Sequence, residues 1–313
     1  MDGTKPRSFK LACLFLLIGS HVVAQEFDTH WIAYPVADST LQVWFRRTYY
    51  MCERPTQASV GVKTTGRFEL FVNERNVSTD ILAPYREGMQ PHPIAMEYDI
   101  TRFLHVGRNT IAVWYSPAYP HIEHRQLSVT YSGRMKNGEY FTHVSDENWL
   151  CREANRTLLS AGGELLDNTY YRLKWNADEV DAACWLGAVS IANKEAEQTT
   201  VYKNVYPAYR VNRIRRQNYF DVEGDSVIYE FGTAFQGWIR VTLRHAKAGE
   251  CVNIGGMEYV CRGETDEQAC RKFTLPECRR IIICGDSRFR KEQIREVEGL
   301  EIVPYIHSAF SFY

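Results

Sequence analysis

The amino-acid sequence predicts an all-β protein made of two tandem antiparallel β-sandwiches. The clearest pattern lies in the segment 229–244 (YEFGTAFQGWIRVTLR), where apolar and polar side chains alternate strictly from Ile239 to Arg244. This period of two is typical of a half-buried strand. Similar short apolar segments recur at intervals of about ten residues, as in sandwich proteins. No segment has a helical period long enough for a helical domain.

The first predicted domain spans residues 25–193 and consists of strands joined by polar or glycine-containing turns. A short helical turn is expected at 101–104, and residues 146–185 are less regular, with a second helical turn just before Trp185. The expected strands are at 41–50, two within 60–72 separated by a turn at 65–66, 110–115 after a turn at 107–109, 127–131 and 140–144.

The second predicted domain spans residues 194–313 and begins with a polar linker at 194–198. In this domain a glycine-bracketed break is expected to separate the alternating strand after Trp238 from the shorter hydrophobic strand before it. The expected strands are at 211–214, 226–231, 238–243, 251–254, 280–284 and 302–306.

Residues 1–24 read as an export signal. Lys5, Arg7 and Lys10 precede an apolar run at 11–18 that is too short to span a bilayer. Small residues then lead to Ala24, after which we expect cleavage. The sequence therefore predicts an exported protein, periplasmic or extracellular, with no later membrane span.

Composition narrows the classes of partner. The formal net charge is −1, which gives no reason to expect a nucleic-acid or membrane-surface partner. Aromatic residues make up 13% of the chain, including 19 Tyr and 7 Trp. Aromatic rings pack well in sheets and also stack on sugars, and core packing is the commoner role for any single ring.

Eight cysteines follow the predicted signal, and five of them fall between Cys251 and Cys284. None forms a CxxC pair, so a zinc knuckle is poorly supported. An even number of cysteines in an exported chain permits disulfides. Disulfides and buried free thiols both remain open.

Several motifs follow one another in a fixed order along the chain. They are RFELFVN (67–73), LAP (82–84), YDIT (98–101), GRNTI (107–111), DENW (146–149), Gly163-Glu164, and FGTAFQGW (231–238). Together they resemble the N-terminal β-sandwich region of bacterial α-L-rhamnosidases. The resemblance implies a galactose-binding-like first sandwich and a jelly-roll, concanavalin-like second sandwich. Two positions depart from the family pattern: Glu74 replaces a glycine, and Thr169 replaces an arginine.

The resemblance also implies where the chemistry lies. In this family, paired acids of a C-terminal (α/α)6 barrel carry out hydrolysis, and this chain ends at Tyr313, near the end of the second sandwich. Its last residues, Phe310 to Tyr313, are unusually apolar for a natural terminus. We therefore expect an amino-terminal portion of a longer glycoside hydrolase, whose partner is the missing catalytic domain, or a truncated relative.

No residue of this chain is predicted to be catalytic. Glycoside hydrolysis needs two carboxyl groups about 5 to 10 Å apart, and Glu164 with Asp167 is the one pair that stands out. Because the resemblance implies calcium-assisted rhamnose binding in some accessory modules, Glu164, Asp167 and Asn168 are candidate calcium ligands. The alternative is that these residues only build turns, and no cofactor is required.

A candidate sugar-binding loop covers residues 114–124 (WYSPAYPHIEH), which are rich in rings and imidazoles. The alternative is a loop that is simply stiffened by its prolines. The candidate contacts are Trp114, Tyr115, Tyr119, His121 and His124.

The leading functional hypothesis is a non-catalytic accessory region of an exported α-L-rhamnosidase-like enzyme. It would dock a rhamnose-containing carbohydrate or support the catalytic domain. The alternatives are a self-standing secreted carbohydrate-binding protein and a purely structural interaction module.

Overall fold

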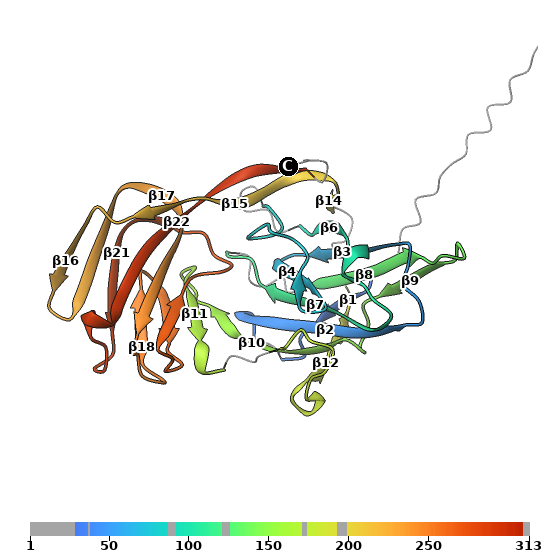
Figure 1. Cartoon of the computed structure of the whole chain (residues 1–313), viewed down its shortest axis with the longest axis horizontal. Helices are drawn as coiled ribbons and strands as arrows, with labels where there is room; N and C mark the ends of the chain where they lie inside the picture. The colour runs from blue at the N-terminus through green and yellow to red at the C-terminus, as the bar shows by residue number, and fades with distance from the viewer. Residues whose placement is uncertain are drawn as a thin grey trace, which may run out of the picture.

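The computed structural model describes residues 29–36, 38–86, 92–120, 126–170, 174–192 and 199–308. It shows two β-rich bodies side by side, with long strands arching from one to the other (Figure 1). The predicted export signal, the linker at 194–198 and the apolar residues 309–313 lie outside the described residues. Among the described residues, no helix is long and apolar enough to cross a membrane.

The first body is built from the strands up to β14. They are β1 (Trp31–Ala33), β2 (Leu41–Met51), β3 (Gln57–Thr64), β4 (Arg67–Val72), β5 (Arg75–Asn76), β6 (Ile94–Asp99), β7 (Gly107–Ser116), β8 (Leu127–Arg134), β9 (Tyr140–Val144), β10 (Leu150–Leu158), β11 (Glu164–Asp167), β12 (Leu186–Gly187), β13 (Val189–Ile191) and β14 (Thr200–Tyr202). Short 3-10 turns are η1 (Thr101–Phe103), η2 (Asn168–Tyr170) and η3 (Ala182–Cys184).

The second body is built from the remaining strands and one 3-10 turn. They are β15 (Val205–Arg216), β16 (Tyr219–Glu223), β17 (Ser226–Arg244), β18 (Cys251–Ile254), β19 (Met257–Val260), β20 (Asp266–Ala269), β21 (Glu277–Gly285), η4 (Lys291–Gln293) and β22 (Ile294–Ser308).

The first body is a β-sandwich, as predicted. A sheet ordered β13-β1-β8-β3-β6-β14 faces the run β10-β2-β7-β4-β5 of the second sheet. Side chains from both sheets, such as Val60 on β3 and Phe45 on β2, fill the space between them. Burial alternates along β3 and β4, which confirms the two strands expected within 60–72.

The glycine-bracketed break expected before Trp238 is wrong. β17 runs without interruption for 19 residues, with a register shift against β21 between Glu230 and Phe235. Gly237 lets β17 approach β22 closely, because a Cβ at this position would lie 2.0 Å from the carbonyl oxygen of Leu300. The glycine therefore keeps the strand inside the sheet. The predicted alternation from Ile239 to Arg244 is confirmed.

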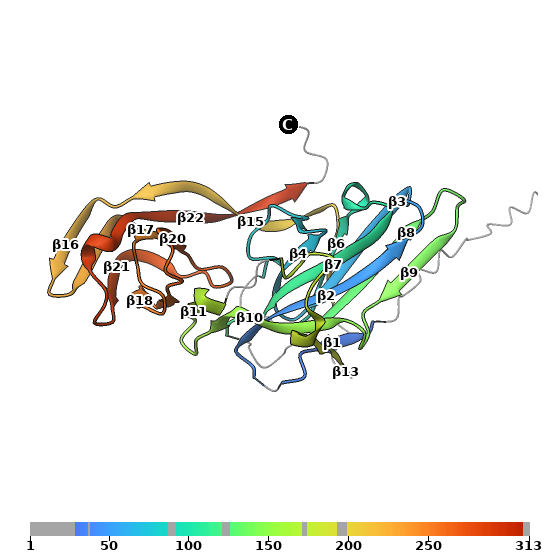
Figure 2. The same ribbon diagram turned by 60° about the horizontal axis from the view of Figure 1, so that its bottom comes forward.

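The two bodies share strands, which the sequence did not predict. β10 and β11 form in the stretch expected to be irregular, and β11 pairs with β10 on one side and with β19 on the other. One sheet consequently continues from the first body into the second, with β10 and β11 lying between them (Figure 2). The β11–β19 and β6–β14 pairings are parallel, in contrast to the predicted antiparallel arrangement.

Residues on each side of the predicted domain boundary also belong to the hydrophobic core of the other body. Leu166 of β11, before the predicted domain boundary at 194, belongs to the core of the second body. Conversely, Tyr206 and Ala208 of β15, after that boundary, belong to the core of the first. Each body therefore contributes apolar side chains to its neighbour's interior.

Within the described residues, all eight cysteines are free thiols. Cys151, Cys261 and Cys278 are buried. Burial raises the pKa of the Cys151 thiol to about 12, which keeps it protonated and unreactive at neutral pH.

Candidate functional site

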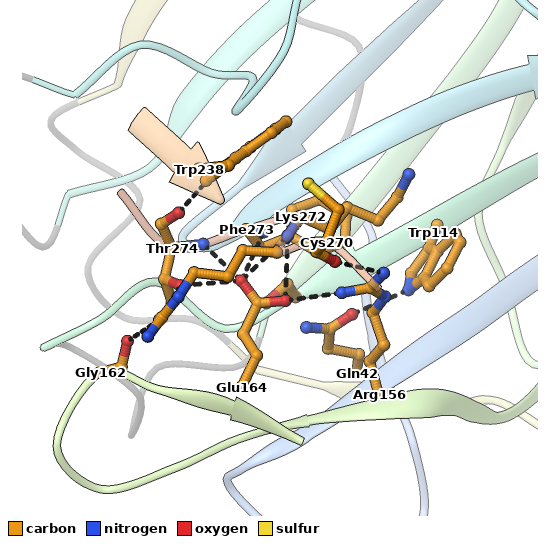
Figure 3. Close-up of polar contacts among 12 residues, drawn as sticks. Gln42, Trp114, Arg156, Gly162, Glu164, Trp238, Cys270, Lys272, Phe273 and Thr274 are labelled. Carbon is orange, nitrogen blue, oxygen red and sulfur yellow. Dashed lines mark hydrogen bonds and ion pairs between the residues drawn. The ribbon is translucent and has the colours of Figure 1, made fainter. Parts of the chain in front are cut away.

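The carboxylate of Glu164, at the start of β11, is fully buried where the two bodies meet. Figure 3 shows it surrounded by donors from both bodies. Arg156 of the neighbouring β10 donates from Nη1 to Oε2 at 3.0 Å. From the second body, the backbone N–H groups of Lys272, Phe273 and Thr274 donate to Oε1 at 3.1, 2.9 and 2.8 Å, and the Thr274 hydroxyl donates at 2.8 Å. We call this cluster the Glu164 junction.

The loop between β20 and β21 supplies these donors because successive N–H groups point to one concave side, a backbone arrangement suited to anions. Further bonds hold the loop in place. Arg156 donates to the carbonyl of Cys270 at 2.9 Å, and Arg271 donates to the carbonyl of Gly162 at 3.0 Å. The Trp238 indole N–H donates to the carbonyl of Thr274 at 2.7 Å. The loop is therefore tied to β10, to the start of β11 and to β17.

The environment keeps Glu164 ionised. Burial alone would raise the pKa of this carboxyl group, but the Arg156 guanidinium, the Thr274 hydroxyl and the backbone N–H groups of Phe273 and Lys272 outweigh it and lower the pKa. An ionised carboxylate whose two oxygens both accept hydrogen bonds has no proton to donate. It also has no free face for a substrate.

Aromatic side chains cover this junction on the first-body side. Trp44 stacks on Trp175 at 5.2 Å between ring centroids, and Trp114 meets both edge-to-face. Phe273 of the second-body loop packs edge-to-face on Trp114 at 5.9 Å. The Lys272 ammonium lies 4.6 Å from the Trp114 ring centroid, a cation–π contact. Ring contacts thus connect the two bodies beside the junction, since Phe273 belongs to the loop that donates to Glu164.

The structure places the first residues of the predicted sugar loop, Trp114 and Tyr115, on strand β7. Trp114 is 8% exposed and its indole N–H donates to Gln42, while Tyr115, on the opposite face of β7, is 3% exposed in the first core. Neither ring offers a face to a ligand, because both sheet faces of β7 are covered. Tyr119 is 49% exposed. His121 and His124 lie outside the described residues.

The three candidate calcium ligands have three different sets of partners. Glu164 accepts the junction hydrogen bonds, Asp167 accepts from the backbone N–H and hydroxyl of Thr169, and Asn168 donates to the Tyr259 hydroxyl. Within the described parts of the chain, no group of three or more His, Cys, Asp or Glu side chains is arranged to hold a metal ion. Calcium binding by Glu164 would require breaking the junction.

Glu164 and Asp167 also fail the geometry for paired acids. Burial alternates along β11, so Glu164 and Leu166 face the interior while Leu165 and Asp167 face outward. Two carboxylates on opposite faces of one strand cannot flank a single glycosidic bond. The Glu164 junction is consequently a structural site that joins two bodies.

Sequence reasoning singled out Glu164 and Trp114 but missed their partners. Arg156 and the loop at 270–274 carry no local motif, and the bonds between Glu164 and this loop join residues 108 to 110 positions apart. The Gly-Glu pair at 163–164, Trp114 and the motif that ends at Trp238 were the signals in the sequence that pointed to this place.

Comparison with known proteins finds similarity to α-L-rhamnosidases. A curated α-L-rhamnosidase of Formosa agariphila is 22% identical, and the match covers 84% of this chain and 32% of the relative. The chain thus spans about a third of the length of that relative.

Solved structures show the same fold. The α-L-rhamnosidase of Dictyoglumus thermophilum superposes with a TM-score of 0.75 at 20% identity, covering 89% of this chain and 36% of that one. An α-L-rhamnosidase of Aspergillus terreus gives 0.73 at 17% identity, covering 88% and 36%. The enzyme of Streptomyces avermitilis, solved with L-rhamnose, gives 0.72 at 18% identity, covering 84% and 28%.

The family assignment rests on the sequence itself. Residues 53–213, more than half of the chain, match the family described as the Alpha-L-rhamnosidase N-terminal domain. The match begins shortly after β2 and ends within β15, so it includes Glu164 and Arg156. This agrees with the resemblance seen in the motifs, and the chain belongs to the α-L-rhamnosidase N-terminal domain family.

Proposed function

We propose that this chain is the accessory region of an exported α-L-rhamnosidase-like glycoside hydrolase, and that it supports the catalytic domain without hydrolysing the substrate itself. One observation carries the proposal. Glu164, an acid that the sequence analysis singled out, is fully buried and accepts hydrogen bonds from donors of both bodies. The side chain that would be the first choice for acid catalysis thus joins the two sandwiches.

The shared architecture supports a positioning role. Domains joined by a small polar interface move relative to one another by default. Here a continuous sheet, an exchange of core residues and a buried ion pair oppose such motion. A rigid two-sandwich platform would hold a following catalytic domain in a constant orientation, and constant orientation favours catalysis.

The absence of intrinsic turnover is tested with p-nitrophenyl α-L-rhamnopyranoside. We expect the purified chain to release nitrophenol no faster than buffer, and the Glu164→Gln and Asp167→Asn variants to be indistinguishable from wild type. Hydrolysis by the wild type that either substitution abolished, in a variant shown by circular dichroism to be folded, would overturn the proposal.

Export is part of the same proposal and has a separate test. The charged head and apolar run of residues 1–24 support it. N-terminal sequencing of the protein recovered from a bacterial periplasm or medium should begin at Gln25. Recovery only of uncleaved protein from the cytoplasm would contradict export without affecting the accessory role.

A further inference from the structure

A second polar cluster joins the two bodies on the side where β15 and β22 reach over the first sandwich (Figure 1). Its centre is Asp80, whose side chain is 1% exposed. Tyr206 donates its hydroxyl to Asp80 Oδ2 at 2.8 Å, and the Tyr305 hydroxyl donates to Oδ1. His307 Nδ1 lies 3.0 Å from Oδ1. A carboxylate of the first body thus fixes three rings of the second.

This arrangement orients the His307 imidazole. A carboxylate only accepts hydrogen bonds, so Nδ1 carries the proton and Nε2 is the acceptor in the neutral ring. Tyr206 and His307 are cross-strand partners, and their rings stack at 4.6 Å with an interplanar angle of 5°. No described residue is a partner of Nε2. The imidazole is therefore held through Nδ1, and Nε2 is the atom that can accept a hydrogen bond from a ligand.

His307 and Tyr206 line a cleft of about 580 Å³ between the two bodies. The other lining residues come from the loop after β2, the segment after β5, β6, η1 and the link between β14 and β15. Its charges nearly balance, with the cations Arg54, Arg102 and Lys203 and the anions Glu97 and Asp99 on its lining. The buried Asp80 behind the rings adds a third negative charge. The hydroxyls of Ser78, Thr79 and Thr101 complete a lining that both donates and accepts hydrogen bonds.

We propose that this cleft is a binding site for a neutral sugar, with His307 Nε2 accepting a hydrogen bond from one of its hydroxyl groups. A ligand rich in hydroxyl groups and without net charge matches a cleft of mixed donors, acceptors and planar rings. An anionic ligand would gain from the three cations but would face Glu97, Asp99 and the buried Asp80. This binding site is a separate proposal from the supporting role, and a negative result for one does not affect the other.

The test is saturation-transfer-difference NMR of the full chain at neutral pH with three probes: L-rhamnose, D-galactose and D-galacturonate. The key variant is His307→Asn, because the asparagine amide can still donate to Asp80 while Nε2 is lost. The matched control is His143→Asn, which alters an exposed histidine that does not line the cleft. Thermal unfolding of both variants checks that the fold is kept.

We expect saturation transfer to at least one of the two neutral sugars, a fall of at least tenfold in apparent affinity for His307→Asn, and no change for His143→Asn. An Asp99→Asn variant, which removes a lining carboxylate without touching the Asp80 cluster, should also weaken binding. No transfer to either neutral sugar, equal binding by wild type and folded His307→Asn, or a clear preference for D-galacturonate would each overturn the proposal.

Discussion

At the scale of single residues, Glu164 shows how a buried charge is stabilised by donors from two bodies. Its desolvation is offset by one guanidinium, one hydroxyl and three backbone N–H groups. Removing one member of such a set leaves the others buried and unpaired, which costs more than the intact set contributes. The Glu164 junction is therefore sensitive to substitutions that preserve size but remove charge.

We predict that Glu164→Gln lowers the free energy of unfolding by about 3–5 kcal/mol, the usual cost of breaking a buried ion pair. The amide nitrogen would face donors and leave the Arg156 charge uncompensated. Urea denaturation followed by Trp fluorescence measures the effect. Glu258→Gln, on the exposed face of β19, is the matched control and should stay within about 0.5 kcal/mol of wild type. Equal stabilities of the two variants would contradict the role of the junction.

Stability should also depend on pH through Glu164 and Glu267. Burial opposes ionisation of Glu267, but the Tyr259 hydroxyl and the N–H groups of the 262–264 turn lower its pKa. Groups with a native pKa below the unfolded value of about 4.3 stabilise the fold above that pH, and this stability is lost as the pH falls through the native pKa.

We therefore expect the urea midpoint of the wild type to fall between pH 5 and pH 3. The midpoint of Glu164→Gln should fall less steeply, because one titrating group is gone, so the two curves should converge in acid. Parallel curves over this range would show that Glu164 does not titrate with a lowered pKa.

At the scale of elements, β11 is the strand on which the two bodies depend. It has only four residues, yet it pairs with β10 and β19 and contributes Leu166 to the second core. The chain reaches β19 so closely at Gly163 that a Cβ there would lie 2.3 Å from the carbonyl oxygen of Gly256. The glycine before Glu164 is needed for contact between two backbones.

Gly163→Ala should destabilise the protein by about 1–3 kcal/mol, the range for overpacking at a tight contact. Gly61→Ala is the control, since the nearest atom to its added Cβ, the carbonyl oxygen of Thr130, lies 3.9 Å away. In a strand interior this second change should be neutral or stabilise by up to about 1 kcal/mol. Chemical denaturation compares the two, and a Gly163→Ala variant as stable as Gly61→Ala would argue against the close approach.

At the scale of the whole molecule, the two sandwiches form one mechanical unit. β11 runs into the second body, while β15 and β22 return across the first (Figure 2). The Glu164 junction and the Asp80 cluster join the bodies at two separate places. If one body unfolded alone, the apolar residues that the other body contributes to its core would become exposed to water.

We consequently predict a single cooperative thermal transition for the whole chain. Differential scanning calorimetry should give a calorimetric enthalpy close to the van't Hoff enthalpy. Glu164→Gln should shift this one peak to lower temperature without splitting it. Two resolved transitions in the wild type would indicate that the sandwiches fold separately.

Much of the fold was predictable because strands leave local patterns. The alternation from Ile239 to Arg244 and the two strands on either side of residue 65 appear in the structure as expected. β10 and β11 were missed because buried charges such as Arg156 and Glu164 break the apolar alternation. Those charges are stable there only because their partners arrive from elsewhere in the chain.

The sequence by itself determined that this protein is an all-β relative of the α-L-rhamnosidase N-terminal region, since periodicity and motif order are local properties. The alternation in the segment 229–244 and the order of the motifs carried that information without any contact being known. Only the tertiary structure decided that Glu164 forms the junction between the two bodies and that Trp114 and Tyr115 are buried. It also decided that Asp80 contacts His307, which lines a cleft. Asp80 and His307 are 227 residues apart, and such pairs are brought together by sheet pairing and core burial.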